Sequence, residues 1–392
     1  MLNLRNDYIQ NKWKPHNAED IHGAIEAEIT QRLGDLGGRL HTGRSRNDQV
    51  VTAFRLTVMK KIRTLQNDVR ELMQALVARA EDHIDVMIPA YTHWQRAQPV
   101  RLSHWLMAQF WPLARDLKRL EQAYESAAIL PLGSGSVSGN PFALDREALA
   151  KKLGFLSISE NSLDAVGDRD FALEFTFACS TLCLHLSRVA EELVIWSTAE
   201  FDFVHWPDAL ATGSSLMPNK KNPDLVELVR GKSATVVGDF TSLMVLLKGL
   251  ATSYQRDLQE DKPPVWRVAE TTALVVQAMT AAMLGIQFQK QNMQNALSDD
   301  LLATEAADIL VARGVPFRRA HHVIGETVAL AKKHQVGLKK LATLGVALPE
   351  PLTAPDLLAL DAETAIERRT IAGGTAKTAV LEQIQRGKVL LK

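Results

Sequence analysis

The sequence predicts an all-α protein built from long helices. Apolar residues recur at helical steps of three and four over several long stretches, whereas the period-two alternation of a half-buried strand is almost absent. A chain of 392 residues also exceeds the usual size of one compact core. We therefore expect an N-terminal helical lobe over residues 1–40, a central long-helix bundle over 41–299 and a small helical C-terminal domain over 300–392.

Charge and cysteine content narrow the possible partners and compartment. Lys plus Arg and Asp plus Glu both number 45, so the net charge gives no general attraction to nucleic acid or an anionic membrane. Cys179 and Cys183 are four residues apart in an apolar helical run, where we expect them simply to pack. We find neither a leader pattern nor an apolar run long enough to span a bilayer, and therefore expect a reducing cytoplasm.

The N-terminal region contains one predicted helix. Residues 1–18 are polar and show little pattern, so we expect a loose lead-in. From Ala18 onward, apolar residues four apart indicate one face of a helix: Ile21, Ile25, Ile29 and Leu33. Asp20 and His22 stand at its entrance, where a histidine is more often a surface or capping residue than a catalytic one.

A first polar island, residues 41–48, precedes a long apolar stripe that begins at Val51. Arg44 and Arg46 flank Ser45, and a guanidinium group can hold a carboxylate with two hydrogen bonds. The alternative is a helix N-terminus with Ser45 or Asn47 as its cap. Both interpretations can hold together.

A second polar island, residues 91–98, stands between Pro89 and Pro99 and is rich in hydrogen-bonding side chains, Thr92 among them. Burying such a dense polar cluster between apolar helices would be costly unless each group had a partner. His93 is the natural acid or base here, because the ordinary pKa of histidine lies near working pH.

The spacing of apolar residues predicts five long helices, over residues 51–82, 102–125, 161–201, 224–249 and 263–291. Helices of such length are typical of bundles whose helices bury faces against one another. Prolines at 316, 349, 351 and 355 punctuate shorter elements after residue 299, which indicates a separate small helical lobe.

The third polar island is the serine loop, residues 212–227, with the sequence TGSSLMPNKKNPDLVE. Gly, Ser and Pro so close together exclude the interior of a regular element, and Pro223 with Asp224 marks the start of the next helix. Two hydroxyls, two ammonium groups and a side-chain amide could grip carboxylates while a serine oxygen handles a proton. For an isolated loop of this composition, a merely solvated surface is the commoner interpretation.

Two glycine-rich segments look like phosphate loops at first sight. Residues 133–139 (GSGSVSG) lack the lysine of such a loop and no strand precedes them, so we interpret them as a flexible connection. Residues 373–377 (GGTAK) lack the required glycine spacing.

The three islands each lie at the end of a long predicted helix. Together they supply anion-gripping arginines and lysines, a histidine and a flexible serine loop, without a metal motif or a cofactor fingerprint. That set of groups suits proton abstraction beside a carboxylate.

Several blocks carry a resemblance to a known family. HTGRSRNDQ, YTHWQRAQP, GSSLMPNKKNPD and YQRDLQEDK resemble successive blocks of the argininosuccinate lyases, within the fumarase/aspartase superfamily. LGSGSVSGNPFALDRE, NSLDAVGDRD and GVPFRRAHH fit the segments between them, so the resemblance covers nearly everything from Ala18 onward. The GSSxMPxKxNP block marks the superfamily, and the TGRSRND block points to the argininosuccinate branch.

The resemblance implies cleavage of argininosuccinate to arginine and fumarate, without a cofactor or metal, by a homotetramer with a fumarase/aspartase-like helix bundle and active sites shared between subunits. It implies Ser214 as the base, Lys220 and Asn222 as stabilisers of the aci-carboxylate, and His93 oriented by Glu227 as proton donor. Its remaining implied substrate contacts are Ser45, Arg46, Asn47, Thr92, Tyr254, Gln259 and Lys262, with Asp20 and His22 at the edge of the site.

The chain departs from the family pattern at three places. Asn219 stands where glutamine is usual, and Gln255 and Arg256 replace an Asn–Lys pair. The family normally begins with a further segment carrying a GGRF-like block, and we expect this chain to start after it. Two alternatives therefore stay open: a catalytically impaired or crystallin-like scaffold, and another superfamily lyase such as adenylosuccinate lyase or aspartase.

Overall fold

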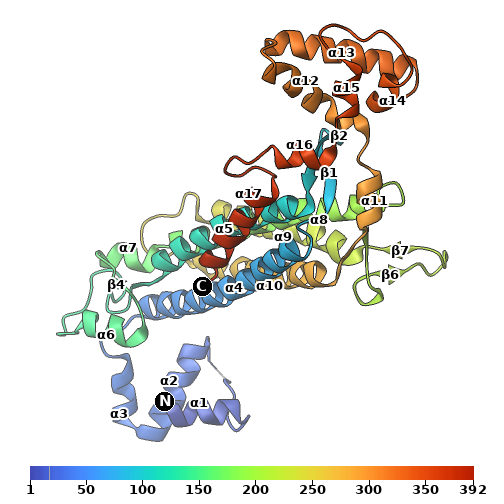
Figure 1. Cartoon of the computed structure of the whole chain (residues 1–392). Coiled ribbons are helices and arrows are strands. Elements are labelled where there is room, and N and C mark those ends of the chain that lie inside the picture. Colours follow the sequence, from blue (N-terminus) through green and yellow to red (C-terminus); the bar gives the residue numbers. More distant parts are fainter. Residues whose placement is uncertain (17) are drawn as a thin grey trace. The chain divides into compact units, whose positions relative to one another are not determined.

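A computed structural model describes residues 1–16 and 18–392 (Figure 1). The predicted all-α fold is confirmed, because 65% of the structure is helical and its strands are few. The chain divides into two compact units. The first unit comprises Met1–Leu65, Lys118–Ser180 and Val236–Glu270, and the second comprises Gln66–Leu117, Thr181–Thr235 and Thr271–Lys392. The predicted domain boundaries near residues 40 and 299 stay predictions.

Five long helices each contribute one part to each unit: α4 (Arg46–Asp82), α5 (Leu102–Ala127), α8 (Asp170–Trp196), α9 (Asp224–Leu247) and α10 (Lys262–Gly285). They correspond to the five long helices predicted from sequence. The predicted helix over residues 161–201 is interrupted, however. A short helix, α7 (Ser162–Gly167), ends before α8 begins, because Asp168 leaves the helical conformation with a ψ of 130°.

The first unit also contains shorter elements: α1 (Leu2–Ile9), α2 (Ile21–Leu33), α3 (Asp35–Gly38), η1 (Arg39–His41), α6 (Arg146–Leu153), η3 (Arg256–Gln259) and the parallel pair β3 (Ile129–Leu130) and β4 (Ser157–Ile158). Its core is aromatic. The ring of Phe54 on α4 lies 5.2 Å from that of Phe171 on α8 and 5.3 Å from that of Trp266 on α10.

The second unit contains three antiparallel strand pairs: β1 (Met87–Thr92) with β2 (Gln95–Arg101), β5 (Val204–His205) with β8 (Gln287–Phe288), and β6 (Thr212–Gly213) with β7 (Lys221–Asn222). Its own helices are η2 (Asp208–Leu210), α11 (Lys290–Asn295), η4 (Asp299–Leu302), α12 (Ala303–Ala312), α13 (Phe317–Lys333), α14 (Leu338–Ala342), α15 (Ala354–Leu358), α16 (Ala362–Glu367) and α17 (Lys377–Leu390).

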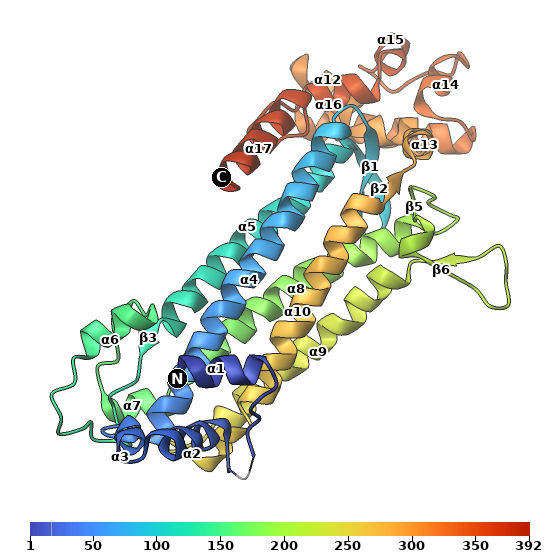
Figure 2. The ribbon, with the colours of Figure 1, turned by 90° about the horizontal axis from the view of Figure 1, so that it is seen from below.

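Within the second unit, the parts of α4, α5, α8 and α10 run alongside one another (Figure 2). Their apolar side chains pack together. Leu76, Leu113, Leu186 and Met283, one from each of these helices, are all at most 2% exposed. Arg101 on β2 is equally buried and ties the β1–β2 hairpin to α16, because its Nη2 donates to Glu367 Oε1 at 2.5 Å. Elements α12 to α15 close around a further apolar cluster that includes Leu310, Ile324, Leu341 and Leu357.

One expectation about loops is wrong, and one strand pair was not predicted. The first residues do not form a loose lead-in, since α1 and the following turn bury Leu4 and Trp13 against Ala24 and Ile29 of α2. The second polar island lies in the β1–β2 hairpin, which the sequence analysis did not predict. Its turn requires positive φ at His93 (54°) and Trp94 (56°), which no alternating apolar pattern announces.

The glycine-rich segment 133–139 is also more fixed than expected. Gly133 and Gly135 donate backbone hydrogen bonds to Asp48 Oδ2 at 3.1 and 2.9 Å, and Ser134 between them is 1% exposed. The start of this segment is therefore anchored to the N-terminus of α4.

One stretch meets the length and composition of a membrane span, contrary to our expectation from sequence. It is the helical run Arg256–Gly285. Of the most apolar 18-residue window in this run, 44% is buried. Length and composition alone do not separate a membrane span from a helix that lines a protein core. Val265, Val268, Val276 and Met279 of this run are at most 1% exposed, as core packing requires.

Candidate active site

The candidate residues of the first unit begin at the N-termini of α2 and α4. Asp20 caps α2 by accepting a hydrogen bond from Gly23 N at 2.7 Å, and its other oxygen lies 3.4 Å from Arg46 Nε. Glu26 approaches the same guanidinium, 3.8 Å from Arg46 Nη2, and also contacts His41. The fork of Arg46 is thus held between two carboxylates at the surface.

His22 belongs to the same group. Burial lowers its pKa below the usual value, Asp20 acts in the opposite direction, and Arg46 adds to the lowering. The structure therefore brings together Asp20, His22 and Arg46, three residues that the sequence predicted separately.

Ser45 and Asn47 lie in a capping turn around Asp48. Ser45 Oγ accepts from Asn47 N at 3.2 Å, and Ser45 N donates to Asp48 Oδ1 at 2.9 Å. Asp48 is fully buried, and burial raises the pKa of its carboxyl despite the backbone N–H groups of Ser45 and Gly133. The capping interpretation of Ser45 is thus confirmed, and Asp48 is a structural residue that the sequence analysis did not select.

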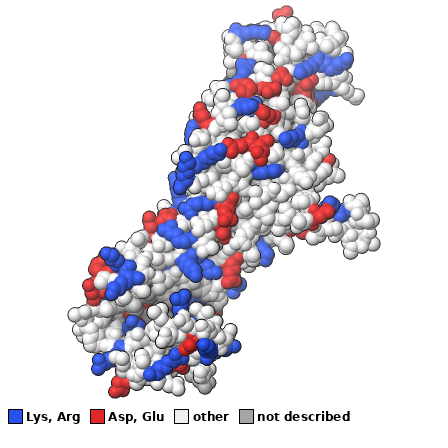
Figure 3. Space-filling view, turned by 60° about the horizontal axis from the view of Figure 1, so that its bottom comes forward, with Lys and Arg blue, Asp and Glu red and all other residues white. Residues whose placement is uncertain are grey.

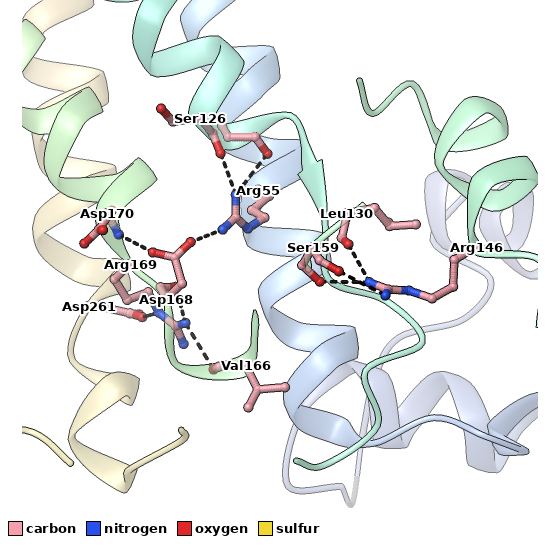
Figure 4. A network of polar contacts seen from close by, with 11 residues as sticks. Arg55, Ser126, Leu130, Arg146, Ser159, Val166, Asp168, Arg169, Asp170 and Asp261 are labelled. Carbon is pink, nitrogen blue, oxygen red and sulfur yellow. Dashed lines mark hydrogen bonds and ion pairs between the residues drawn. The ribbon is translucent and has the colours of Figure 1, made fainter. Parts of the chain in front are cut away.

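Lys262 is the first residue of α10 and is fixed from two sides. Its Nζ donates to Asp261 Oδ1 at 2.6 Å and to Leu258 O at 3.1 Å, and lies 5.3 Å from the ring centre of Phe54. Asp261 is fully buried, and its second oxygen accepts from Arg169 Nε (Figure 4). Arg169 is 3% exposed, so the carboxylate that accepts from Lys262 is part of a buried ion pair.

Tyr254 and Gln259 precede Lys262, on the connection that leads into α10. Tyr254 is half-buried and Gln259 is exposed. Close backbone packing fixes the connection near Tyr254, because a Cβ at Gly167 would lie only 2.8 Å from Ser253 O. At the surface, Arg256 Nη1 approaches Glu19 Oε1 to 3.3 Å, which places η3 beside the entrance of α2.

The serine loop lies in the second unit and is anchored at its base. Thr212 pairs with Asn222 in the β6–β7 ladder, and Thr212 Oγ1 donates to Asp224, in the first turn of α9. At the tip, Ser214 Oγ accepts from Leu216 N at 3.3 Å and from Met217 N at 3.0 Å. Leu216 is 85% exposed, so the predicted exposed loop at the start of a long helix is confirmed.

The two lysines of this loop differ. Lys221 forms an ion pair with Asp208, whose pKa its ammonium group lowers. Lys220 lies at the exposed tip and has no carboxylate within 4 Å in the described part of the chain. Of the pair, Lys220 is therefore the cation available to a ligand.

His93 and Thr92 are exposed at the turn of the β1–β2 hairpin. His93 lines a cavity of about 520 Å³ together with Trp105, Arg188 and Glu192. Glu227 instead lies 3.7 Å from Arg230 Nη2, and within residues 1–16 and 18–392 it makes no hydrogen bond to His93. The predicted orientation of His93 by Glu227 stays a prediction.

The other polar side chains of the described residues form no metal centre, and charges of both signs occur on the face in Figure 3. The described residues contain no group of three or more His, Cys, Asp or Glu side chains placed to hold a metal ion. Figure 3 shows basic and acidic side chains interspersed on the face that it presents. The candidate ligand-binding charges are therefore the local ones, Arg46 and Lys262 in the first unit and Lys220 in the second.

Two family models and two similar relatives indicate one family. Residues 9–238 match the family described as lyase, and residues 300–367 match the argininosuccinate lyase C-terminal family. An argininosuccinate lyase of Roseiflexus castenholzii is 47% identical over 374 residues, covering 95% of this chain and 82% of that protein. One of Schizosaccharomyces pombe is 47% identical over 368 residues, covering 94% and 80%.

A solved structure gives the same result for the fold. It is an EDDS lyase variant with bound fumarate, which superposes with a TM-score of 0.86 at 25% identity and covers 99% of this chain and 78% of that one.

Proposed function

The chain belongs to the argininosuccinate lyase family of the fumarase/aspartase superfamily and is a carbon–nitrogen lyase, and we propose that it cleaves argininosuccinate to arginine and fumarate. The observation that carries this proposal is the serine loop, in which Ser214 and the free ammonium of Lys220 lie on one exposed tip. The fumarate bound to the related EDDS lyase is consistent with the proposed product.

The proposed reaction begins at Ser214. Its oxygen removes a proton from the succinyl carbon beside a carboxylate, and the electron pair moves into that carboxylate as a doubly negative aci-carboxylate. Lys220 and Asn222 stabilise this charge where it develops. The electron pair then forms the carbon–carbon double bond of fumarate while the carbon–nitrogen bond breaks, and His93 delivers a proton to the departing guanidino nitrogen.

A serine hydroxyl is a weak base unless its oxyanion is stabilised. Ser214 Oγ accepts hydrogen bonds from the backbone N–H groups of Leu216 and Met217. These two hydrogen bonds would stabilise the oxyanion of Ser214. Closure of the loop over substrate would add the field of Lys220 and exclude water. The high exposure of Leu216 supports such a closure, because an apolar side chain gains by leaving water.

We further propose a homotetramer in which several subunits share each site. Large apolar residues of α8, α9 and α10 are exposed: Leu184 by 52%, Leu228 by 59%, Val245 by 66%, Leu274 by 56% and Leu284 by 63%. Such surfaces on long helices are typical of subunit contacts. In this arrangement Glu227 of one subunit would reach His93 of another, which explains why the two do not meet within one chain.

The remaining ligand contacts follow the same proposal. Ser45, Arg46, Asn47 and Thr92 would hold the dicarboxylate end of the substrate, and Tyr254, Gln259 and Lys262 the rest. Cys179 and Cys183 are both fully buried, and burial raises the pKa of the Cys183 thiol to about 12. Buried reduced thiols of this kind are in keeping with the cytoplasmic location that we propose.

Fumarate release from argininosuccinate by the purified 392-residue chain tests the function, with molar mass measured by light scattering in the same sample. We expect turnover by a tetramer, and none with adenylosuccinate as the control substrate. A tetramer that releases no fumarate would contradict the lyase activity and favour a crystallin-like scaffold. Turnover with adenylosuccinate alone would assign another branch of the superfamily.

A further inference from the structure

Charged residues of alternating sign are connected in series in the first unit: Arg55, Asp168, Arg169 and Asp261 (Figure 4), followed by Lys262. Arg55 donates to the Asp168 carboxylate, and Arg169 Nη1 donates to the backbone oxygen of Asp168 at 2.8 Å. Arg169 Nε then donates to Asp261, which accepts from Lys262. The chain of contacts begins deep in the unit and ends at a residue with a predicted ligand role.

Stability alone does not account for the central pair. Arg169 and Asp261 are 3% and 0% exposed, and taking two such charges out of water costs about as much as their attraction returns. Apolar residues of similar volume often stabilise a core equally well. The pair therefore calls for a role that an apolar contact could not fill.

The geometry at Lys262 points to that role. An ammonium group has three N–H donors, and Asp261 and Leu258 O accept two of them. Because the Lys262 side chain is 28% exposed, the remaining donor is accessible to a ligand. A flexible lysine whose head is held by two acceptors presents one N–H in a fixed place, and so loses little further entropy when it binds an anion.

We infer that Asp261 and Arg169 are positioning residues of the active site: Arg169 fixes the Asp261 carboxylate, which holds the Lys262 ammonium for an anionic group of the substrate. This inference rests on the proposed function for the identity of the substrate. Neither residue need touch the substrate itself.

The other half of the network supplies a matched control. Asp168 accepts from Arg55, and its second oxygen accepts from Asp170 N at 2.7 Å, but it does not contact Lys262. Arg55 donates in turn to Ser126 O at 2.6 Å. Asp168→Asn thus removes one carboxylate charge from the same network without changing the acceptors of Lys262.

Steady-state kinetics separate positioning from stability. Asp261→Asn is expected to raise KM for argininosuccinate about tenfold and to leave kcat within about threefold, because a charged hydrogen bond that orders substrate binding is lost. Asp168→Asn is expected to lower the melting temperature and to leave KM within about twofold. An unchanged KM in Asp261→Asn, or an equal rise in both variants, would overturn the inference.

A second measurement does not depend on turnover. Acetylation of Lys262 by acetic anhydride, followed by peptide mass spectrometry, is expected to be about threefold faster in Asp261→Asn than in the parent, because one of two acceptors loses its charge. Asp168→Asn should label at the parental rate. If Asp261→Asn does not fold, Arg169→Lys serves instead, with the same direction expected.

The outcomes separate the two proposals. A parent chain that releases no fumarate counts against the proposed function alone, whereas equal Lys262 labelling in the parent and in Asp261→Asn counts against the positioning role whether or not fumarate is released.

Discussion

The segment before α10 and the serine loop hold their lysines in opposite ways. Lys262 donates to a fully buried carboxylate that is itself paired with a buried arginine. Lys220 lies at the tip of a loop that is anchored at its base, through the β6–β7 ladder and the Lys221–Asp208 pair. The first arrangement suits a group that must be in place before substrate arrives, and the second suits groups that move into place afterwards.

This contrast leads to separate predictions for the turnover rate and for folding stability. Substitutions at the loop tip should change turnover and leave folding intact, because little of the fold depends on them. Substitutions in the buried network should lower folding stability, because each leaves a partner uncompensated away from water. Those at Arg169 and Asp261 should weaken substrate binding as well, because these two residues hold Lys262.

Ser214→Ala should give the largest effect. Loss of the proposed base is expected to lower kcat about a thousandfold while KM and the melting temperature stay near those of the parent. Assays of fumarate release measure kcat and KM, isothermal titration calorimetry measures the binding of argininosuccinate, and thermal unfolding measures the melting temperature.

The neighbouring Ser215 provides the control, since Ser215→Ala removes a hydroxyl from the same exposed tip and should keep turnover within about threefold. If Ser214→Ala retained turnover within a few-fold of the parent, the base would be Ser215 or His93 instead.

Arg169→Met should give the largest loss of stability. It leaves the buried Asp261 carboxylate with Lys262 as its remaining charged partner, and breaking a buried pair in this way costs about 3 kcal/mol. Urea unfolding followed by circular dichroism measures the loss.

Lys221→Met is the exposed counterpart. Its pair with Asp208 has side-chain exposures of 63% and 87%, so solvent screens the attraction and we expect no measurable change in the unfolding midpoint. The contrast between the two regions fails if both variants lose the same stability.

Gly167→Ala tests backbone packing beside Tyr254. The added Cβ would lie 2.8 Å from Ser253 O, and relief of such a contact typically costs about 1–3 kcal/mol. Because the displaced backbone adjoins Tyr254, KM should rise together with the loss of stability. Gly213→Ala in the serine loop is the matched glycine, since its Cβ would meet no atom within 4 Å, and its unfolding midpoint should equal that of the parent.

Sequence reasoning succeeded where local pattern determines structure. Apolar spacing was sufficient for the five long helices, and Pro223 with Asp224 was sufficient for the start of α9. The β1–β2 hairpin was not predictable in this way, because its turn depends on positive φ at two non-glycine residues, His93 and Trp94. The early packing of Leu4 and Trp13 was missed because a few buried side chains suffice to order a short polar segment.

Within the candidate site, the residues missed from sequence are those that act through long-range pairs. Arg169 and Asp261 are 92 positions apart, so no local spacing connects them. Asp48 differs, because an acidic residue in the first turn of a helix is an expected N-terminal feature. Its additional bonds to Gly133 and Gly135 depend on the fold and could not be read from that position.

The Arg101–Glu367 pair is intermediate between the two regions, so its loss of stability should lie between those of Arg169→Met and Lys221→Met. Arg101 is 2% exposed but Glu367 is 40% exposed, so water screens the pair and Glu367→Gln should cost about 1 kcal/mol or less at neutral pH. The hydrogen bond from Arg101 lowers the pKa of Glu367 below its usual 4.5, so the charged pair contributes above that pH and is lost as pH falls through the lowered pKa. The difference in unfolding free energy between parent and Glu367→Gln should therefore shrink to zero on acidification. Glu363→Gln, also on α16, should show no difference at any pH, and a Glu367→Gln difference that persists in acid would assign the effect to packing rather than charge.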